Sequence, residues 1–330
     1  MKNHWDNDEN IFYFRIYKPK LFHTMIKSTN RRNFIKNLGM LSAAAGVTTL
    51  LPIDVFALAK KDFFKISLAE WSFHKALFAG KMTNLDFPLK AKNDFGIDIV
   101  EYVSVFFKKQ ESDPAYMKEL LTRTKNEGIQ NHLIMVDGEG NLGDSDDAAR
   151  LTAVKNHHKW VDTAKYLGCK TIRVNAAGKG TAEEVKAAAV DGLGKLSEYG
   201  KQQKINIIVE NHGGYSSDGQ WLSSVIKQVN NPYCGTLPDF GNFRIGKDQE
   251  YDRYQGVKDL MPYAKGVSAK SLDFNEQGDE TTIDYKKMFD IIKAAKWNGI
   301  VGIEYEGSKL SEEEGVRKTK ALLDRLLKQY

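Results

Sequence analysis

The sequence from Phe63 to the C-terminus alternates short apolar runs with longer amphipathic stretches. Eight runs rich in Val, Ile and Leu have the character of strands: Phe64–Trp71, Ile97–Val103, Gln130–Val136, Thr171–Asn175, Ile205–Glu210, Gly235–Pro238, Gly266–Ala269 and Ile300–Tyr305. Stretches with helical spacing lie between and after them, at Pro114–Asn126, Ala148–Leu167, Ala182–Gln203, Gln220–Val229, Tyr285–Ala295 and Glu312–Lys328. Such alternation predicts parallel strands joined by right-handed crossovers.

Eight strand–helix units in about 270 residues predict an α/β fold, a single-domain (β/α)8 TIM barrel. The main alternative is a doubly wound open sheet, which normally carries a Gly-rich phosphate loop after its first strand. Here the first run leads into Trp71-Ser72-Phe73-His74, which is no such loop. The sequence therefore favours the barrel.

Residues 1–59 have the pattern of a twin-arginine export signal. Arg31 and Arg32 precede an apolar stretch, Leu38–Leu51, that is too short to span a bilayer well. A small-x-small cleavage site ends at Ala59, and Met25 would give a signal of more usual length. We expect a leader at 1–59, a barrel at 60–330, recognition by the twin-arginine export machinery, and a periplasmic protein. An uncleaved leader would instead anchor it to the membrane.

The charge balance excludes a nucleic-acid partner. The chain holds 48 Lys and Arg against 43 Asp and Glu, a net charge of +5. Eight of the basic and four of the acidic residues lie in 1–59, which leaves 40 and 39 in the remainder. The barrel is therefore near neutral, without the basic excess that nucleic-acid binding requires. Two cysteines also exclude a disulfide scaffold and a Cys-rich zinc site.

Acidic side chains terminate three of the last four predicted strands. Glu210 ends the fifth, Asp239 follows the sixth, and Glu304 lies at the end of the eighth, while Lys270 ends the seventh. In a barrel of this type the C-terminal strand ends form the active face. Three carboxylates converging there repel one another unless a cation lies among them.

These residues resemble the xylose isomerase-like barrel superfamily, which includes sugar-phosphate isomerases and epimerases and an endonuclease branch. The resemblance covers roughly residues 63–330 and implies a divalent metal held by Glu, Asp, His and Glu. Carried over, the ligands are Glu210, Asp239 and Glu304, while Ser268 stands where the family usually has His. Mn²⁺, Mg²⁺, Co²⁺ or Zn²⁺ would be the cofactor, although a hydroxyl is a poor ligand for Zn²⁺. The site could draw on His212 instead, or be metal-free with Lys270 supplying the positive charge.

The resemblance implies proton transfer next to a carbonyl. Glu210 and Glu304 would act as the acid–base pair, and Lys270 or His212 would polarise the substrate oxygen. Side chains at the other strand ends are candidates for substrate binding: Trp71, His74, Asn175, His212 and Asn242. Glu101 and Arg173, inside the barrel, are expected either to contact substrate or to pair with each other.

The sequence therefore predicts an exported sugar isomerase or epimerase that acts on a small carbohydrate, a free keto-sugar or a related compound. A keto-glycoside lyase would use the same Glu pair, and a non-catalytic carbohydrate-binding barrel is the third alternative. The endonuclease branch uses three zinc ions and several His ligands, but only five His residues follow Lys60. The sugar and the oligomeric state are not indicated by the sequence.

Overall fold

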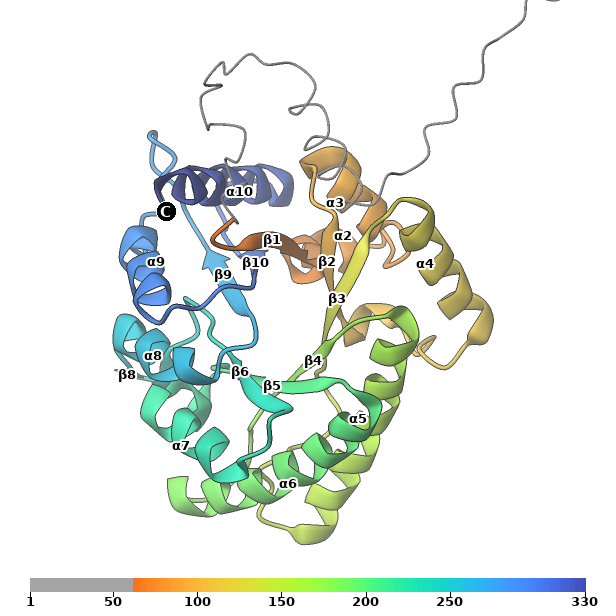
Figure 1. Ribbon diagram of the computed structural model, residues 1–330, viewed down its shortest axis with the longest axis vertical. Helices are drawn as coiled ribbons and strands as arrows, with labels where there is room; N and C mark the ends of the chain where they lie inside the picture. The colour runs from red at the N-terminus through yellow and green to blue at the C-terminus, as the bar shows by residue number, and fades with distance from the viewer. Residues whose placement is uncertain (1–61) are drawn as a thin grey trace, which may run out of the picture. The chain divides into compact units, whose positions relative to one another are not determined.

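A computed structural model describes residues 62–330 and shows a barrel of eight parallel strands (Figure 1). The predicted leader and its boundary lie outside the described residues and stay predictions. The sheet has the order β6-β5-β4-β3-β2-β1-β10-β9. Its strands are β1 (Lys65–Ala69), β2 (Ile99–Val103), β3 (Gln130–Met135), β4 (Thr171–Val174), β5 (Asn206–Glu210), β6 (Cys234–Leu237), β9 (Val267–Ser271) and β10 (Ile300–Tyr305).

The two ends of this sheet meet and close the barrel. Parallel bridges join Thr236 to Ala264 and Asp239 to Ser268. The Ser268 amide donates to the Pro238 carbonyl at 2.9 Å, and the Phe240 amide donates to the Ser268 carbonyl at 3.1 Å. The predicted (β/α)8 fold is confirmed. One of the bridges that close the barrel joins Asp239 to Ser268, at the position of the candidate site.

Helices surround the barrel. The predicted helices are α4 (Pro114–Asn126), α5 (Asp147–Leu167), α6 (Ala182–Gln203), α7 (Gly219–Val229), α9 (Tyr285–Ala294) and α10 (Glu312–Gln329). Three further helices and a small antiparallel hairpin were not predicted: α2 (His74–Phe78), α3 (Phe87–Phe95), α8 (Arg253–Leu260), and the strands β7 (Arg244–Gly246) and β8 (Gln249–Glu250). Short 3₁₀ turns follow several strands: η1 (Glu70–Phe73), η2 (Ser104–Phe107), η3 (Gly214–Ser217) and η4 (Met261–Tyr263).

Local sequence explains where the long helices begin and end. Thr181 and Ser311 precede α6 and α10 and form capping boxes. In each, the hydroxyl accepts a hydrogen bond from the backbone amide of the Glu three residues later, and the carboxylate of that Glu accepts one from the backbone amide of the capping residue. The α5 helix ends at Gly168, whose φ of 82° lies in the left-handed region that glycine adopts readily. None of the helices in residues 62–330 is both long and apolar enough to cross a membrane.

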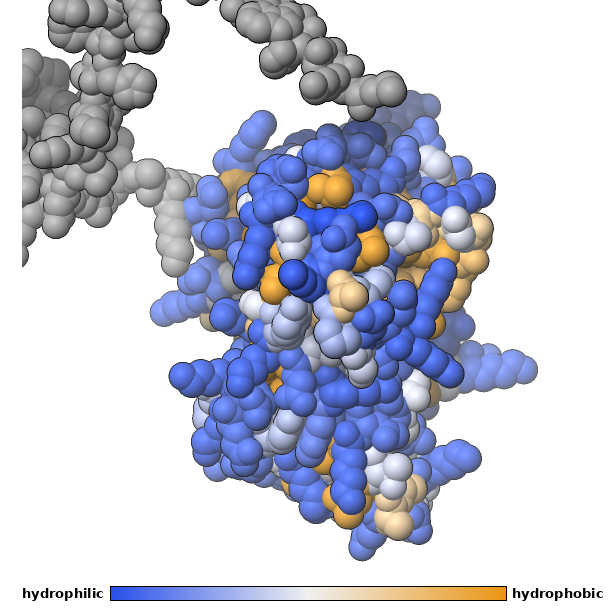
Figure 2. Space-filling model, turned by 90° about the vertical axis from the view of Figure 1, so that its right-hand side faces the viewer, coloured by the Kyte–Doolittle hydropathy of each residue, from blue (hydrophilic) through white to orange (hydrophobic). Residues whose placement is uncertain are grey.

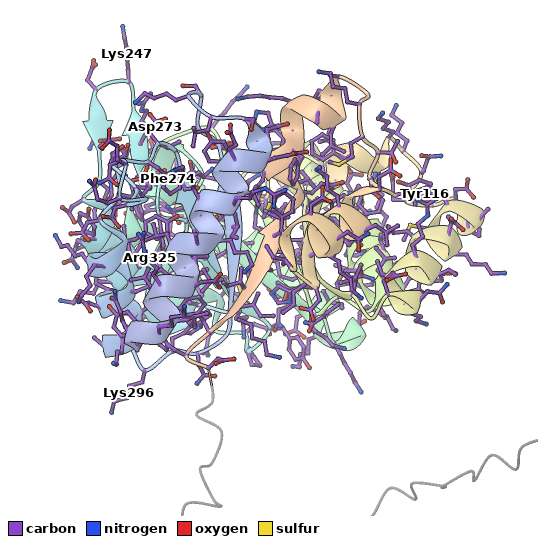
Figure 3. The ribbon with its side chains drawn as sticks, turned by 90° about the horizontal axis from the view of Figure 1, so that it is seen from above. Tyr116, Lys247, Asp273, Phe274, Lys296 and Arg325 are labelled. Atoms are coloured by element: carbon purple, nitrogen blue, oxygen red, sulfur yellow. The ribbon has the colours of Figure 1, made fainter. Side chains whose placement is uncertain are left out.

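The hydrophobic core fills the space between barrel and helices. The face of the barrel that Figure 2 shows is mostly hydrophilic with small hydrophobic patches. The two ends of the barrel differ. Figure 3 shows Lys247, on the β7–β8 hairpin, at one end and Lys296, just before β10, at the other. The hairpin end is where the strands finish, and we call it the mouth.

Candidate active site

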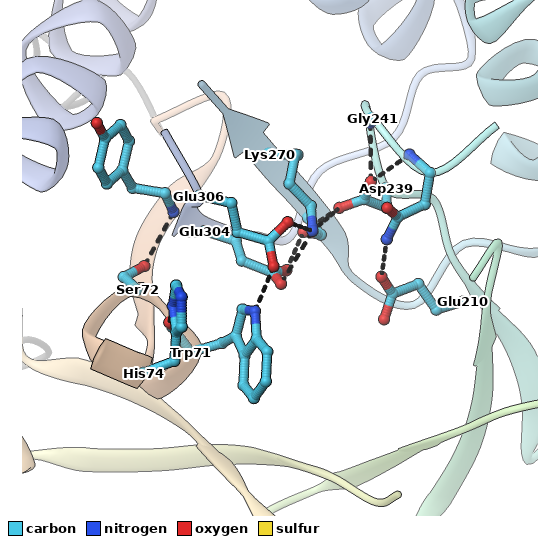
Figure 4. Close-up of polar contacts among 12 residues, drawn as sticks. Trp71, Ser72, His74, Glu210, Asp239, Gly241, Lys270, Glu304 and Glu306 are labelled. Atoms are coloured by element: carbon cyan, nitrogen blue, oxygen red, sulfur yellow. Dashed lines mark hydrogen bonds and ion pairs between the residues drawn. The ribbon is translucent and has the colours of Figure 1, made fainter. Parts of the chain in front are cut away.

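Three buried carboxylates meet at the mouth (Figure 4). Glu210 is the last residue of β5, Asp239 lies two residues beyond β6, and Glu304 is the penultimate residue of β10. One oxygen from each lies within 4.8 Å of the others. These residues are at most 4% exposed, so the mutual repulsion of their carboxylates is poorly screened by solvent. We refer to these three residues as the carboxylate cluster.

Ser268 occupies the position inside the cluster where the family resemblance places a histidine. Its Oγ lies 2.7 Å from Asp239 Oδ2 and 2.8 Å from Glu304 Oε2. A hydroxyl has one proton and can donate to only one of these oxygens. The other contact needs a proton or a cation between the oxygens, because two carboxylates cannot both approach a single donor without repulsion. Either a proton on one of the two carboxyl groups or a bound positive ion would meet this requirement.

Lys270 supplies one fixed positive charge to the cluster. Its Nζ lies 2.7 Å from Glu306 Oε2, 3.2 Å from Glu304 Oε1 and 4.0 Å from Asp239 Oδ2. Lys270 is 3% exposed, so these ion pairs lie in a medium of low polarity. Glu306 was not among the residues predicted for the site. It lies two residues after Glu304, so the alternation of side chains along a strand could have indicated that it faces the same way.

Arg173, on β4, supplies the second positive charge. Its Nε lies 2.7 Å from Glu210 Oε2, and its Nη1 donates to Asp137 Oδ1 at 2.8 Å. The expected pair between Arg173 and Glu101 is therefore wrong. Glu101 instead accepts a 2.6 Å hydrogen bond from the Ser67 hydroxyl.

The two candidate asparagines orient carboxylates at the mouth. Asn242 Nδ2 donates to Glu210 Oε1 at 2.9 Å, while the Asn242 amide donates to Asp239 Oδ1 at 2.8 Å. Asn175 Nδ2 donates to Asp137 Oδ1 at 2.7 Å. His212 is exposed at the mouth and is not part of the carboxylate cluster, so the structure gives no support to His212 as a replacement ligand.

The environment separates the pKa values of the acids. Burial raises the pKa of Glu210 to about 7 against the opposing charge of Arg173, and burial raises the pKa of Asp239 to about 7 against Lys270. Burial also acts to raise the pKa of Glu304, but Lys270, Ser268 and Arg173 together outweigh it and leave this pKa below its usual value. Without a further cation, burial therefore opposes full ionisation of the cluster near neutral pH.

The donor set suits a divalent cation. Four buried acidic residues, Glu101, Glu210, Asp239 and Glu304, accompany only two buried basic residues, Arg173 and Lys270, so full ionisation of these acids would require a further cation. Glu210, Asp239 and Glu304 could each offer one oxygen to a metal ion. An all-oxygen set of this kind is preferred by Mg²⁺ and Mn²⁺.

Aromatic side chains lie beside the cluster, after strand β1, which pairs with β10. Trp71, in η1, donates its indole N–H to Glu306 Oε1, and its ring stacks on His74 with centroids 5.0 Å apart. The His74 Nδ1–H donates to the Trp71 carbonyl at 2.8 Å. Trp71 is thus tied through Glu306 to Lys270, which places it next to the carboxylate cluster (Figure 4).

A protein-family model, the xylose isomerase-like TIM barrel, matches residues 89–326. The chain belongs to this family. The match spans every strand from β2 to β10 and includes the whole carboxylate cluster. No curated protein sequence matches the chain.

Solved structures of the same fold include several sugar epimerases. The IOLI protein with a bound zinc atom has a TM-score of 0.63 and 17% identity, covering 81% of this chain and 99% of that one. L-ribulose 3-epimerase has a TM-score of 0.63 and 14% identity, with coverage of 81% and 95%. The 3-keto-D-glucoside 4-epimerase of E. coli has a TM-score of 0.58 and 15% identity, with coverage of 79% and 99%. These likenesses show a shared fold.

Proposed function

We propose that this protein is an isomerase or epimerase that acts on a free keto-sugar or related carbohydrate by removing a proton next to a carbonyl. The observation that carries the proposal is the carboxylate cluster of Glu210, Asp239 and Glu304, buried at the mouth beside Lys270. The protein's membership of the xylose isomerase-like family supports the reaction class, as do the similar solved structures of an L-ribulose 3-epimerase and a D-psicose 3-epimerase.

The chain's own residues supply the proton transfers. Glu210 and Glu304 extend from strands that are separated by β6 and β9, and one oxygen of each lies within 4.8 Å of the other, so both can reach one bound sugar. One carboxylate takes the proton from the carbon beside the carbonyl, and the other returns a proton to the new position. Lys270 Nζ donates a hydrogen bond to the oxygen on which negative charge develops.

A divalent cation held by Glu210, Asp239 and Glu304 supplies Lewis acidity at the carbonyl and hydroxyl oxygens when it is bound. Asp239 is fixed for such a role, because the Gly241 and Asn242 amides each donate to its Oδ1 at 2.8 Å. The other oxygen, Oδ2, faces Ser268 and Lys270 inside the cluster. We propose Mg²⁺ or Mn²⁺ rather than Co²⁺ or Zn²⁺, because every donor is an oxygen.

The test is deuterium exchange from heavy water into a panel of ketoses, with Mg²⁺ and Mn²⁺ supplied. We expect exchange at one carbon-bound position by the wild-type protein. Glu210→Gln and Glu304→Gln should each lower its rate about 100-fold or more. Glu183→Gln, an exposed carboxylate on α6, is the matched control and should leave the rate unchanged. Equal exchange in all four proteins would contradict the assignment.

A keto-glycoside lyase is the second candidate. The similar fold of the 3-keto-D-glucoside 4-epimerase is the observation that favours a keto-glycoside substrate. Both reactions begin with the same proton abstraction, but a lyase then expels the aglycone. Incubation with a 3-keto-glucoside separates them, since release of free aglycone indicates the lyase, and an intact glycoside with exchanged deuterium indicates the isomerase or epimerase.

We also propose that the protein is exported to the periplasm through the twin-arginine machinery. The support is the order of Arg31-Arg32, the apolar stretch and the small-x-small site in the sequence. Replacing both arginines with lysine should keep the protein in the cytoplasm, as fractionation would show. Arg15→Lys, outside the motif, is the control. Periplasmic protein in the doubly substituted variant would contradict the proposal.

A further inference from the structure

Three aromatic rings pack together at the mouth, those of Trp71, Phe78 and Phe106, and we call this group the aromatic ledge. Phe78 is exposed, Trp71 is half-buried and Phe106 is buried. The ring centroids of Trp71 and Phe78 are 6.0 Å apart, those of Phe78 and Phe106 are 5.1 Å apart, and those of Trp71 and Phe106 are 5.9 Å apart. Phe78 is 61% exposed, the highest value among the exposed large hydrophobic side chains of residues 62–330. A phenylalanine held in water beside other aromatic rings marks a surface suited to an apolar partner.

The aromatic ledge is continuous with the carboxylate cluster. Trp71 follows β1 and Phe106 follows β2, so both rings stand on loops of the mouth. The Trp71 indole donates to Glu306, whose other oxygen accepts from Lys270 at 2.7 Å. Lys270 in turn contacts Glu304 at 3.2 Å. A ligand that extends from the cluster across Glu306 therefore meets Trp71 first and Phe78 next.

The side chains of the ledge determine which non-reacting group of a ligand can bind there. Phe78 carries no polar side-chain atom, so it offers a hydroxyl group no conventional hydrogen-bond partner. It does offer a flat apolar face, which packs against the C–H face of a sugar ring or against an aryl ring, while the buried Phe106 supports it from the protein side. A monosaccharide held at the cluster would leave Phe78 uncovered, whereas a glycoside would place its second ring there.

We propose that the aromatic ledge is a subsite for the second ring of a glycoside whose first sugar reacts at the carboxylate cluster. The inference rests on the proposed function and narrows its substrate class from free sugars to glycosides. A second copy of the chain is a poorer occupant. Stable interfaces need about 1,000 Å² or more. Among residues 62–330, Val105 is the one other exposed large hydrophobic side chain near the ledge, on η2 beside Phe106, while Leu151 and Tyr166 lie apart on α5.

Calorimetry on the full-length chain tests the subsite with ligands that cannot undergo the reaction, because they contain no ketone. The probes are methyl glycosides, phenyl glycosides and disaccharides, each in glucoside, galactoside and mannoside series. We expect at least one series in which the phenyl glycoside or the disaccharide binds roughly tenfold more tightly than the methyl glycoside. Phe78→Ala should reduce that ratio to about twofold or less. Tyr166→Ala, another exposed aromatic, should leave the ratio as it is.

The result shows which ring the ledge accepts. A preference confined to phenyl glycosides indicates an aryl aglycone, and one confined to disaccharides indicates a second sugar. The subsite is overturned if no series shows a preference, if Phe78→Ala retains the preference, or if Tyr166→Ala abolishes it equally. It is also overturned if sedimentation shows a wild-type dimer that Phe78→Ala converts to monomers, because the ledge would then be a subunit interface.

Failure of the subsite and failure of the proposed function are separate outcomes. Deuterium exchange into ketoses without any second-ring preference removes the subsite and keeps the chemistry. A preference that Phe78→Ala abolishes, with no exchange into any ketose or keto-glycoside, keeps the subsite and removes the chemistry.

Discussion

The Ser268 hydroxyl lies 2.8 Å from Glu304 Oε2 while it also lies 2.7 Å from Asp239 Oδ2. Replacing it with histidine would add the nitrogen donor that the family resemblance leads one to expect. We predict that Ser268→His binds Zn²⁺ at least tenfold more tightly than the wild-type protein, because imidazole is a good ligand for Zn²⁺. Titration calorimetry with Zn²⁺ and Mg²⁺ measures both affinities. Ser268→Ala is the control, and equal Zn²⁺ affinity in all three proteins would refute the argument.

Glu306 competes with the carboxylate cluster for the ammonium group of Lys270. Its carboxylate holds Lys270 Nζ at 2.7 Å, closer than Glu304 at 3.2 Å or Asp239 at 4.0 Å. In Glu306→Gln the ammonium is shared only between Glu304 and Asp239, whose oxygens a metal needs. We expect the affinity for Mn²⁺ to fall roughly threefold to tenfold. Glu313→Gln, which loses an exposed pair with Lys90, serves as the control. Unchanged or tighter binding in Glu306→Gln would contradict this role.

Much of the fold was predictable because strand–helix alternation is a strong and repeated signal. The strand ends carrying Glu210, Asp239, Lys270 and Glu304 could be located from that alternation, since all parallel strands finish at one end of the barrel. The α2, α3 and α8 helices were missed. They are five, nine and eight residues long, too short to show a clear helical period.

The pairing of buried charges could not be read from the sequence. Glu101 and Arg173 look complementary, but β3 lies between their strands β2 and β4. Strand β4 pairs with β5 in a register that sets Arg173 beside Ile208, two residues before Glu210 on the same face. The guanidinium therefore reaches Glu210, and only the assembled register reveals it.

Glu70 makes the stability of the barrel depend on pH. The side chain is fully buried, where it accepts hydrogen bonds from the Val103 amide at 2.9 Å and Asn84 Nδ2 at 3.1 Å. Burial raises the pKa of Glu70 from its ordinary 4.5 to about 8. Between these values the folded protein keeps a proton that the unfolded chain has released. The free energy of unfolding therefore falls as pH rises, by up to about 1.4 kcal/mol per unit from this group.

Glu70→Gln removes this proton linkage. We predict that the variant gains stability relative to the wild-type protein by about 3 kcal/mol between pH 5 and pH 8. Urea unfolding at both pH values measures the difference, and other titrating groups cancel in the comparison. Glu119→Gln, exposed on α4, should show no such gain. A difference between Glu70→Gln and the wild-type protein that stays constant with pH would show that Glu70 is ionised in the folded state.

Two glycines on α6, only two residues apart, should respond to alanine in opposite ways. A Cβ at Gly192 would meet the Leu142 carbonyl oxygen, a backbone atom, and would lie 3.3 Å from Arg150 Cδ. A Cβ at Gly194 has no neighbour within 4 Å. Gly192→Ala should therefore lower the free energy of unfolding by about 1–3 kcal/mol through overpacking. Gly194→Ala should raise it by about 0.5–1 kcal/mol, because alanine is the better helix former. Urea unfolding measures both changes, and a Gly192→Ala variant as stable as Gly194→Ala would show that α6 moves away from Leu142 at little cost.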